Sequence, residues 1–251
     1  MSRRRRLDAD LVRRGLVASR VEAQELIDLG RVLVNGAVAD KASRQVDPAD
    51  AVVVDGPPAR FVSRGGEKLA AALETFDLDV TGRRVLDAGA STGGFTDCLL
   101  QCGADHVVAL DVGHGQLHPK IRDHHQVTVI ERFNVREVTT EVIGGPVDMV
   151  VADLSFISLT LVIEPLIGVC REGADLVLLV KPQFEAGRRD VARGRGVVTD
   201  PLVRQRAVDT VSDAVRATGA RVLGVIESPI KGGQGNVEFL LHATAHGRLD
   251  P

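Results

Sequence analysis

The sequence predicts an α/β protein in which a doubly wound, mostly parallel sheet of seven strands follows a small α+β domain. Two observations carry this prediction. From residue 84 onward, short apolar runs alternate with stretches of helical periodicity, a pattern typical of helices on both faces of a parallel sheet. Before that, residues 1–57 hold two short helical patterns and a hairpin pattern, and Pro57-Pro58 then stiffens the chain. We therefore expect domains at 1–57 and 68–251, joined by a linker at 58–67.

The small domain begins with a helix whose apolar residues share one face and which ends at Gly15. Ser19 and Glu22 form a capping box, a serine N-cap with an acid three residues later, and this predicts the start of a second helix. Asn35-Gly36 then predicts a tight hairpin, because both residue types tolerate the positive φ angles of its turn.

The large domain is predicted from its apolar runs and from one well-marked helix. That helix covers 202–218, with Asp200 as N-cap, Pro201 at its first position and Gly219 just past its end. A shorter helix is expected from Leu69 to Phe76. The seven candidate strands are 84–87, 106–110, 127–130, 148–152, 175–180, 221–227 and 237–243.

The composition excludes several classes of protein. Hydrophobic residues make up 44% of the 251 residues, which is too many for a disordered chain. No run reaches the ~20 apolar residues of a membrane span, and no apolar stretch follows the N-terminal arginines as it would in a signal peptide. The three cysteines form no C-x-x-C motif and indicate reduced thiols. We therefore expect a cytoplasmic protein that does not bind membranes.

Charge is distributed unevenly along the chain. Residues 1–60 hold 11 Lys+Arg against 9 Asp+Glu, whereas the remaining residues hold 20 against 25. A basic N-terminal part on a mildly acidic body suggests an anionic partner at that end. Aromatic residues make up only 3%, with no Tyr and no Trp, which argues against aromatic stacking as the main way of holding nucleic acid.

A glycine-rich turn after the first strand of the large domain predicts a cofactor site. Such a turn between a strand and a helix lets a ligand approach the backbone closely. Asp87 at its start suits the cationic amino-acid end of S-adenosylmethionine better than a pyrophosphate, and residue 91 is not the glycine of a dinucleotide fingerprint. Asp111, which closes the next strand, can accept both ribose hydroxyls of an adenosine cofactor. We therefore favour S-adenosylmethionine over NAD.

Asn134, just past the third strand, either lies beside the adenine or caps a loop. The candidate cofactor-binding residues are Asp87, Gly89, Ala90, Ser91, Thr92, Gly93, Gly94, Phe95, Asp111 and Asn134.

Charged residues at the ends of later strands mark a second kind of site. Asp153 and Lys181 each follow directly after an apolar strand, which places them at the same edge of a parallel sheet. Glu238 is the only charge in an apolar run and needs a partner there. The chain has 26 Arg but only five Lys, and lysine, unlike arginine, can give up its proton in a protein. From spacing alone, Lys181 is either a functional group or a structural partner of Asp153.

Longer motifs carry a resemblance to a known family. Residues 6–36 match the S4 RNA-binding module nearly position for position. Together with this module, the whole chain resembles the TlyA family, also called haemolysin A, whose catalytic domain is similar to the FtsJ-type ribose methyltransferases. The motifs that carry the resemblance are V-S-R-G-G-x-K-L, D-A-G-A-S-T-G-G-F-T, V-A-D-L-S-F-I-S-L, V-K-P-Q-F-E-x-G and G-N-x-E.

The resemblance implies a Rossmann-like methyltransferase sheet and a catalytic tetrad of Lys68, Asp153, Lys181 and Glu238. It further implies 2′-O-methylation of cytidine in ribosomal RNA within ribosomal subunits, and the arginine-rich start resembles the type that modifies both the 16S and the 23S RNA. RNA contact is expected through basic residues of the S4 module and of the linker, and a basic segment at 188–196 is either an RNA-contacting loop or a solvated one. The RNA-binding candidates are Arg4, Arg6, Arg13, Arg14, Arg20, Arg64, Arg188 and Arg189.

The chemistry of this reaction leaves two roles open for Lys181. A ribose hydroxyl is a weak nucleophile, so the enzyme must align it with the methyl group and remove its proton. Lys181 either acts as the base in its neutral form, aided by nearby cations, or stays charged and stabilises the developing oxyanion. A non-catalytic ribosome-associated RNA-binding factor is the alternative function, and a lytic protein is disfavoured because no spanning pattern is present.

A metal site is not expected. Four histidines lie close together in the sequence, but their spacing resembles no structural zinc site. They are His114, His118, His124 and His125.

Overall fold

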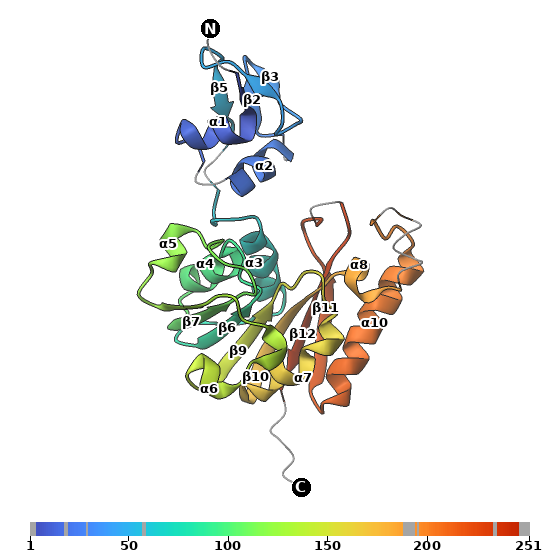
Figure 1. Cartoon of the computed structure of the whole chain (residues 1–251). Coiled ribbons are helices and arrows are strands. Elements are labelled where there is room, and N and C mark those ends of the chain that lie inside the picture. The colour runs from blue at the N-terminus through green and yellow to red at the C-terminus, as the bar shows by residue number, and fades with distance from the viewer. Residues whose placement is uncertain are drawn as a thin grey trace. The chain divides into compact units, whose positions relative to one another are not determined.

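The computed structural model describes residues 4–17, 20–28, 30–56, 59–187, 194, 196–232 and 235–245 (Figure 1). The chain divides into two compact units, Met1–Arg64 and Gly65–Pro251, and each is described by itself. The domain limits expected from the sequence remain a prediction. Five residues named above, Ser19, Pro57, Pro58, Arg188 and Arg189, lie outside the described residues.

The smaller unit combines two short helices with antiparallel strands. Its elements are β1 (Arg5–Arg6), α1 (Leu7–Arg13), α2 (Arg20–Asp28), β2 (Val32–Val34), β3 (Ala37–Val38), β4 (Gln45–Val46) and β5 (Val52–Val54). Strands β3, β2 and β5 form one sheet in that order, and β1 pairs with β4. Asn35 and Gly36 both have positive φ angles between β2 and β3, which confirms the predicted hairpin. Leu7, Leu11 and Ile27 pack with the inner strand residues into one small core.

The larger unit contains a seven-stranded sheet, in the order β11-β12-β10-β9-β6-β7-β8. Its strands are β6 (Arg84–Ala88), β7 (His106–Leu110), β8 (Val127–Ile130), β9 (Val147–Ala152), β10 (Cys170–Val180), β11 (Arg221–Glu227) and β12 (Phe239–Thr244). Only β12 runs against its neighbours, and the pairs from β10 to β8 are parallel. This confirms the predicted fold class. The last strand begins at Phe239 rather than at residue 237, so Glu238 lies just before it.

Helices cover both faces of this sheet (Figure 1). They are α3 (Gly65–Thr75), α4 (Gly94–Gln101), α5 (Pro119–Arg122), α6 (Thr140–Ile143), α7 (Ile163–Gly168), α8 (Pro182–Glu185) and α10 (Pro201–Ala217), with 3-10 turns η1 (Val135–Glu137) and η2 (Leu159–Leu161). The Asp200 side chain accepts a hydrogen bond from the Leu202 amide, which confirms the predicted cap of α10. None of the described helices is long and apolar enough to cross a membrane.

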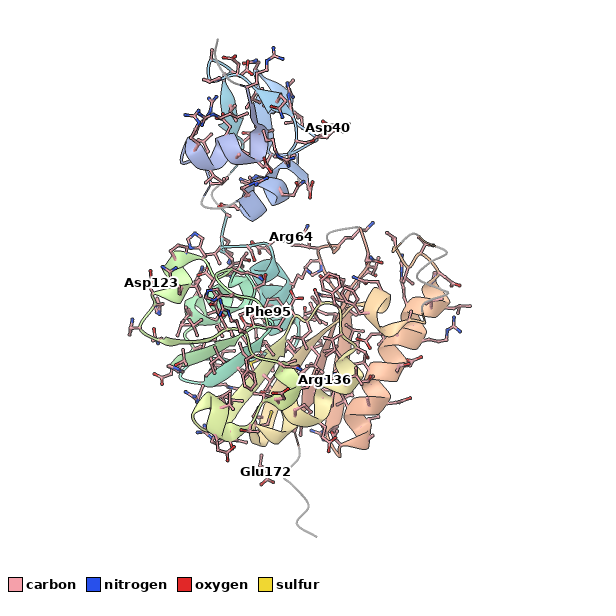
Figure 2. All side chains as sticks on the ribbon, in the orientation of Figure 1. Asp40, Arg64, Phe95, Asp123, Arg136 and Glu172 are labelled. Atoms are coloured by element: carbon pink, nitrogen blue, oxygen red, sulfur yellow. The ribbon has the colours of Figure 1, made fainter. Side chains whose placement is uncertain are left out.

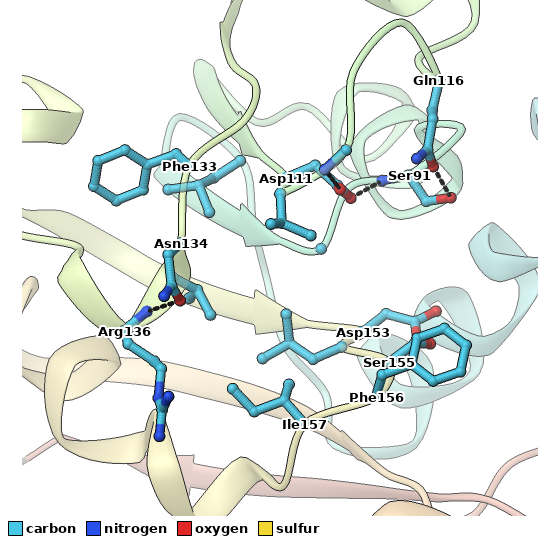
Figure 3. Close-up of a pocket in the computed structure, with 16 residues that line it drawn as sticks. Ser91, Asp111, Gln116, Phe133, Asn134, Arg136, Asp153, Ser155, Phe156 and Ile157 are labelled. Carbon is cyan, nitrogen blue, oxygen red and sulfur yellow. Dashed lines mark hydrogen bonds between the residues drawn. The ribbon is translucent and has the colours of Figure 1, made fainter.

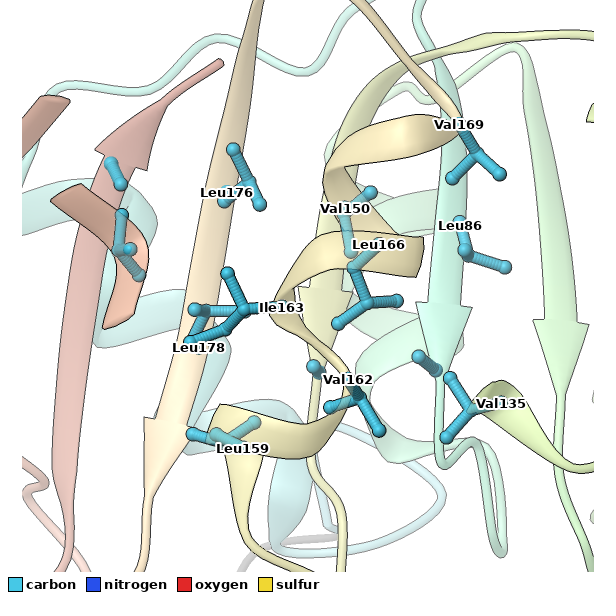
Figure 4. Close-up of a cluster of buried hydrophobic side chains, with 14 of the residues drawn as sticks. Leu86, Val135, Val150, Leu159, Val162, Ile163, Leu166, Val169, Leu176 and Leu178 are labelled. Carbon is cyan, nitrogen blue, oxygen red and sulfur yellow. The ribbon is translucent and has the colours of Figure 1, made fainter. Parts of the chain in front are cut away.

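The main core lies between one face of the sheet and the helices α7 and α10 that cover it. Ile163 and Leu166 of α7 pack over Leu86, Val150 and Leu178 of the sheet (Figure 4). Full burial of each such side chain contributes roughly 1.5–3 kcal/mol. This packing fixes the strands in register and places the carboxyl ends of β6, β9 and β10 side by side at one edge of the sheet.

Candidate active site

Two buried lysine–carboxylate ion pairs lie at this edge. Lys68 of α3 donates a hydrogen bond from Nζ to Oε2 of Glu238, at 2.5 Å. Lys181 Nζ lies 2.6 Å from Oδ1 of Asp153 and also donates to the Ser155 hydroxyl at 2.9 Å. Both lysines and Glu238 are buried. Because a buried charge is costly without a partner, the pairing accounts for how the fold tolerates these three, with the half-buried Asp153 as the fourth member.

The register of the sheet explains why residues far apart in sequence meet here. Val180 of β10 lies opposite Phe239 of β12, so Lys181 and Glu238 occupy the same end of neighbouring strands. Asp153 follows β9, the parallel neighbour of β10 on its other side. The partner that the sequence required for Glu238 is thus Lys68, 170 residues away.

A pocket of about 550 Å³ adjoins Asp153 (Figure 3). This volume is within the range of small-molecule sites. Five of the predicted site residues line it: Gly89, Ser91, Asp111, Asn134 and Asp153. Three further lining residues that the sequence analysis did not single out are Gln116, Phe133 and Arg136.

Asp111 and Asn134 hold the loops on one side of the pocket. The Asp111 carboxylate accepts hydrogen bonds from the amides of Ser91, at 2.8 Å, and Gly113, at 2.6 Å. The Asn134 side chain accepts one from the Arg136 amide at 3.1 Å and so caps η1. Asn134 therefore caps a loop and lines the pocket at once, so the two predicted alternatives are compatible.

The glycine-rich turn passes very close to the segment after β9. Gly89 has a φ of 87°, and a Cβ atom there would lie 2.6 Å from the backbone oxygen of Asp153, so only glycine fits. Phe95 is buried (Figure 2), and Gly93 is the N-cap of α4. The predicted cofactor residues that are not among those lining the pocket are Asp87, Ala90, Thr92, Gly93, Gly94 and Phe95.

Asp87 is completely buried beneath this turn. Its Oδ2 accepts a hydrogen bond from the Thr96 hydroxyl at 2.6 Å, while its Oδ1 has no hydrogen-bond partner among the described residues. Burial raises the pKa of Asp87 to about 7, the Thr96 hydroxyl opposes this rise, and the carboxylates of Asp153 and Asp111 add to it. A buried carboxylate with an unused oxygen and no cation beside it is suited to a cationic ligand.

Phe156 is a site residue that the sequence analysis missed. The residue is 92% exposed, its backbone has a φ of 65°, and the centroid of its ring lies 5.3 Å from that of Phe184. Lys181 Nζ in turn lies 5.9 Å from the Phe184 ring. The low aromatic content argued against stacking surfaces, but an aromatic residue directly after a strand end, in D-L-S-F, was the pattern that could have revealed this one.

The predicted RNA-contacting arginines of the smaller unit are mostly engaged with aspartates. Arg6 and Arg20 pair with Asp8, and Arg13 and Arg14 pair with Asp10. Arg14 also donates to backbone oxygens of the segment 47–50, which ties α1 to the loop before β5.

Arg4 is exposed and Arg64 is half-buried. The side chains of Arg6, Arg13 and Arg20 remain partly exposed beside their aspartate partners, whereas that of Arg14 is more buried. RNA contact by all of these arginines remains a prediction.

The histidines of the predicted large domain serve other contacts. His114 Nδ1 lies 2.6 Å from Glu131, and the rings of His124 and His125 stack at 4.8 Å. Over the part of the chain that the structure describes, no three His, Cys, Asp or Glu side chains are grouped so that they could hold a metal ion.

Comparisons with known proteins match both units. The FtsJ-like methyltransferase family matches residues 61–245, and the S4 domain matches residues 5–52. The chain is 52% identical to the 16S/23S rRNA (cytidine-2′-O)-methyltransferase TlyA of Mycobacterium tuberculosis, over 96% of this chain and 90% of that protein. It is 40% identical to Hemolysin A of Brachyspira hyodysenteriae, over 94% and 98% of the two chains. A solved hemolysin-type structure from Streptococcus thermophilus is 38% identical, with a TM-score of 0.77 over 98% of this chain and 90% of that one.

Proposed function

The chain belongs to the TlyA family of FtsJ-like methyltransferases with an S4 domain, and we propose on this basis that it transfers a methyl group from S-adenosylmethionine to the ribose 2′-hydroxyl of cytidine in ribosomal RNA. The observation that carries the proposal is the pair of buried lysine–carboxylate ion pairs beside a pocket of cofactor size, at the carboxyl edge of the sheet. The name of the Mycobacterium tuberculosis relative supports both the 16S and the 23S RNA as substrates.

The residues around the pocket fit this cofactor. Asp87 has a buried oxygen without a partner, and a cationic group of the cofactor would supply the missing charge. Asp111 presents its carboxylate to the pocket at the end of the next strand, where it suits ribose hydroxyls. When bound, S-adenosylmethionine supplies a methyl group that its sulfonium already activates.

The protein must then align and deprotonate the RNA hydroxyl. Lys181 is buried, and its Nζ is held between Asp153 and Ser155, so it cannot turn away from the site. An incoming hydroxyl reaches Nζ when it takes the place of one of these two partners. Lys181 either accepts the hydroxyl proton in its neutral form or remains charged and stabilises the developing alkoxide. Lys68, already paired with Glu238, adds a second cation to the same edge.

Phe156 offers a surface for the target base. Single RNA bases that leave a stack are commonly held on aromatic side chains. The exposed Phe156, directly after Ser155, would hold the base while its ribose faces Lys181. The S4 unit would bind the flanking RNA backbone through its exposed arginines.

The test is to incubate the protein with radiolabelled S-adenosylmethionine and separated small and large ribosomal subunits, and to digest the RNA to nucleosides. We expect label in 2′-O-methylcytidine from both subunits. Label in only one subunit would restrict the substrate to the RNA of that subunit. No label with intact cofactor binding would instead favour the non-catalytic RNA-binding alternative, and the absence of cofactor binding would refute the methyltransferase function itself.

A further inference from the structure

Glu185 is a half-buried carboxylate that neither the ion pairs nor the pocket of the proposed reaction uses. It ends α8, four residues after Lys181, and its side chain reaches the segment that follows β9. Oε1 accepts a hydrogen bond from the Leu159 amide at 2.9 Å, and Oε2 accepts one from the Ser158 hydroxyl at 2.5 Å. Burial raises the pKa of Glu185 above its ordinary value, and these two donors oppose the rise.

These hydrogen bonds close one end of a contact between two segments, 153–159 and 181–185. At the other end, Asp153 pairs with Lys181. In the middle, the Phe156 ring lies against the Phe184 ring. Each segment therefore supplies one member of the ion pair, one aromatic ring, and either the donors or the acceptor of the Glu185 hydrogen bonds. These contacts join the two segments at both ends and in the middle.

The segment after β9 needs such support because its backbone is strained at Phe156. A φ of 65° in a residue with a Cβ atom costs roughly 1–3 kcal/mol. The ring is almost fully exposed, so little burial offsets this cost. The conformation must therefore be held by contacts on each side of Phe156, which are Asp153 before it and the Glu185 hydrogen bonds after it.

We propose that Glu185 is a positioning residue for the methyl transfer: its carboxylate fixes the segment 153–159 against 181–185, so that Phe156 and the Lys181–Asp153 pair keep the geometry that the target nucleotide needs. This inference rests on the proposed function for its catalytic part. The opposing interpretation is that Glu185 only caps η2 and stabilises the fold.

Substitutions at Glu185 separate these two interpretations. Glu185→Ala removes both hydrogen bonds, and we expect kcat on ribosomal subunits to fall about 10- to 100-fold, since small displacements of reacting groups have effects of this size. Glu185→Gln should stay within about threefold of wild type, because its carbonyl can accept from Leu159 and its amide can donate to Ser158, whose hydroxyl then turns to Thr160, 2.7 Å away. Glu164→Ala, at an exposed site in the first turn of α7, is the matched control and should stay within about twofold.

A second readout follows the segment without any assay of activity. The chain contains no tryptophan, so Phe156→Trp places a single fluorophore on it. We expect the fluorescence anisotropy of this tryptophan to decay faster on the nanosecond timescale when Glu185→Ala is added, and to be unchanged when Glu185→Gln is added. If wild-type protein transfers no methyl group, the proposed function fails, while the anisotropy still decides whether Glu185 holds the segment.

Three results would overturn the inference. They are a kcat for Glu185→Ala within twofold of Glu164→Ala, an unchanged anisotropy decay, and a Glu185→Gln variant as impaired as Glu185→Ala. If Glu185→Ala does not fold, Ser158→Ala removes one of the two donors at less cost, and it should lower kcat and speed the anisotropy decay in the same direction. A merely structural role would lower the melting temperature and leave kcat per folded molecule unchanged.

Discussion

Asp87 and Asp175 are buried aspartates on two strands of one sheet, and their surroundings are opposite. Asp175 of β10 lies 2.8 Å from His242 Nε2 and accepts a hydrogen bond from Arg83 at 2.6 Å. Burial acts to raise the pKa of Asp175, but His242 and Arg83 outweigh it and the pKa is lowered. Asp87 accepts hydrogen bonds from Thr96 and has no cationic partner among the described residues, and burial raises its pKa to about 7. A buried carboxylate that the fold pairs with cations stabilises the fold, whereas we propose that Asp87, which lacks such a partner among the described residues, meets a cationic ligand.

The two aspartates also differ in their distance from the carboxyl edge of the sheet. Asp175 lies at the level of Met149 in β9, whereas Asp87 lies at the level of Val151, closer to the edge that carries Asp153 and Lys181. We therefore expect substitutions near the carboxyl edge to change activity and ligand binding, and substitutions around Asp175 to change stability. Each of the following experiments can break this division.

The largest effect is expected from Lys181→Ala. Methyl transfer should fall by about 10³-fold or more, because removal of a positioned proton-transfer group or oxyanion stabiliser costs on the order of 10² to 10⁴. S-adenosylmethionine should still bind within about threefold of the wild-type affinity, because the proposed role of Lys181 is toward the RNA hydroxyl and not toward the cofactor. Single-turnover assays and isothermal titration calorimetry measure the two quantities, and a variant that loses cofactor binding would contradict the assignment.

The opposite pattern is expected from Asp175→Asn. This change leaves Arg83 and His242 without their carboxylate and should lower the free energy of unfolding by about 3 kcal/mol, as the breaking of a buried ion pair does. Below the unfolding transition, kcat should stay within about twofold of wild type. Urea denaturation followed by circular dichroism gives the stability. A loss of kcat with unchanged stability would contradict the assignment of Asp175 to stability rather than to activity.

Much of this division is visible in the sequence. The apolar runs predicted all seven strands. The rule that the carboxyl ends of parallel strands meet at one edge predicted that Asp153 and Lys181 lie close together, and the structure confirms this. The isolated charge of Glu238 predicted the need for a partner. The resemblance placed Lys68 in the same tetrad, but only the structure shows that Lys68 is this partner, because sequence spacing does not say which helix packs against a strand.

The remaining features depend on tertiary contacts. Arg83, Asp175 and His242 lie 67 or more residues from one another where they bond, and no local pattern marks them as partners. Phe156 is exposed and has a left-handed backbone angle, which a phenylalanine rarely adopts and which no propensity predicts. Glu185 likewise gains its contacts only when two strand ends meet.

Asp87→Asn should show two opposite effects. Because the pKa of Asp87 is higher in the folded protein than in the unfolded chain, Asp87 contributes stability at a pH below its unfolded-state pKa, near 4. This contribution is lost as the pH rises through about 7. The neutral asparagine avoids this loss, so at pH 8 the variant should be more stable than wild type by on the order of 2 kcal/mol, and the difference should shrink toward pH 4. Its affinity for S-adenosylmethionine should fall by about tenfold, because the charge that would meet the cofactor is gone. Thermal unfolding across this pH range, with calorimetry for the cofactor, measures both, and equal destabilisation at every pH would count against an unpaired Asp87.

The smallest effect is expected in the pH dependence of cofactor affinity in the wild-type protein. This measurement tests the difference between Asp87 and Asp175 most directly. If a cation of S-adenosylmethionine completes the site, it binds the ionised form of Asp87, which is the minor form below pH 7. The affinity should therefore rise by up to about tenfold per pH unit between pH 5.5 and 6.5 and level off above pH 7. Measurements should stop near pH 7.5, because an α-amino group such as that of the cofactor begins to lose its own proton at about 7.7.

Two variants are the controls for this rise of affinity with pH. Asp175→Asn should keep it, since the pKa of Asp175 is already lowered by its own partners, and Asp87→Asn should abolish it. A flat wild-type profile would mean that Asp87 is ionised before the cofactor arrives, and the two aspartates would then differ in their partners but not in their charge.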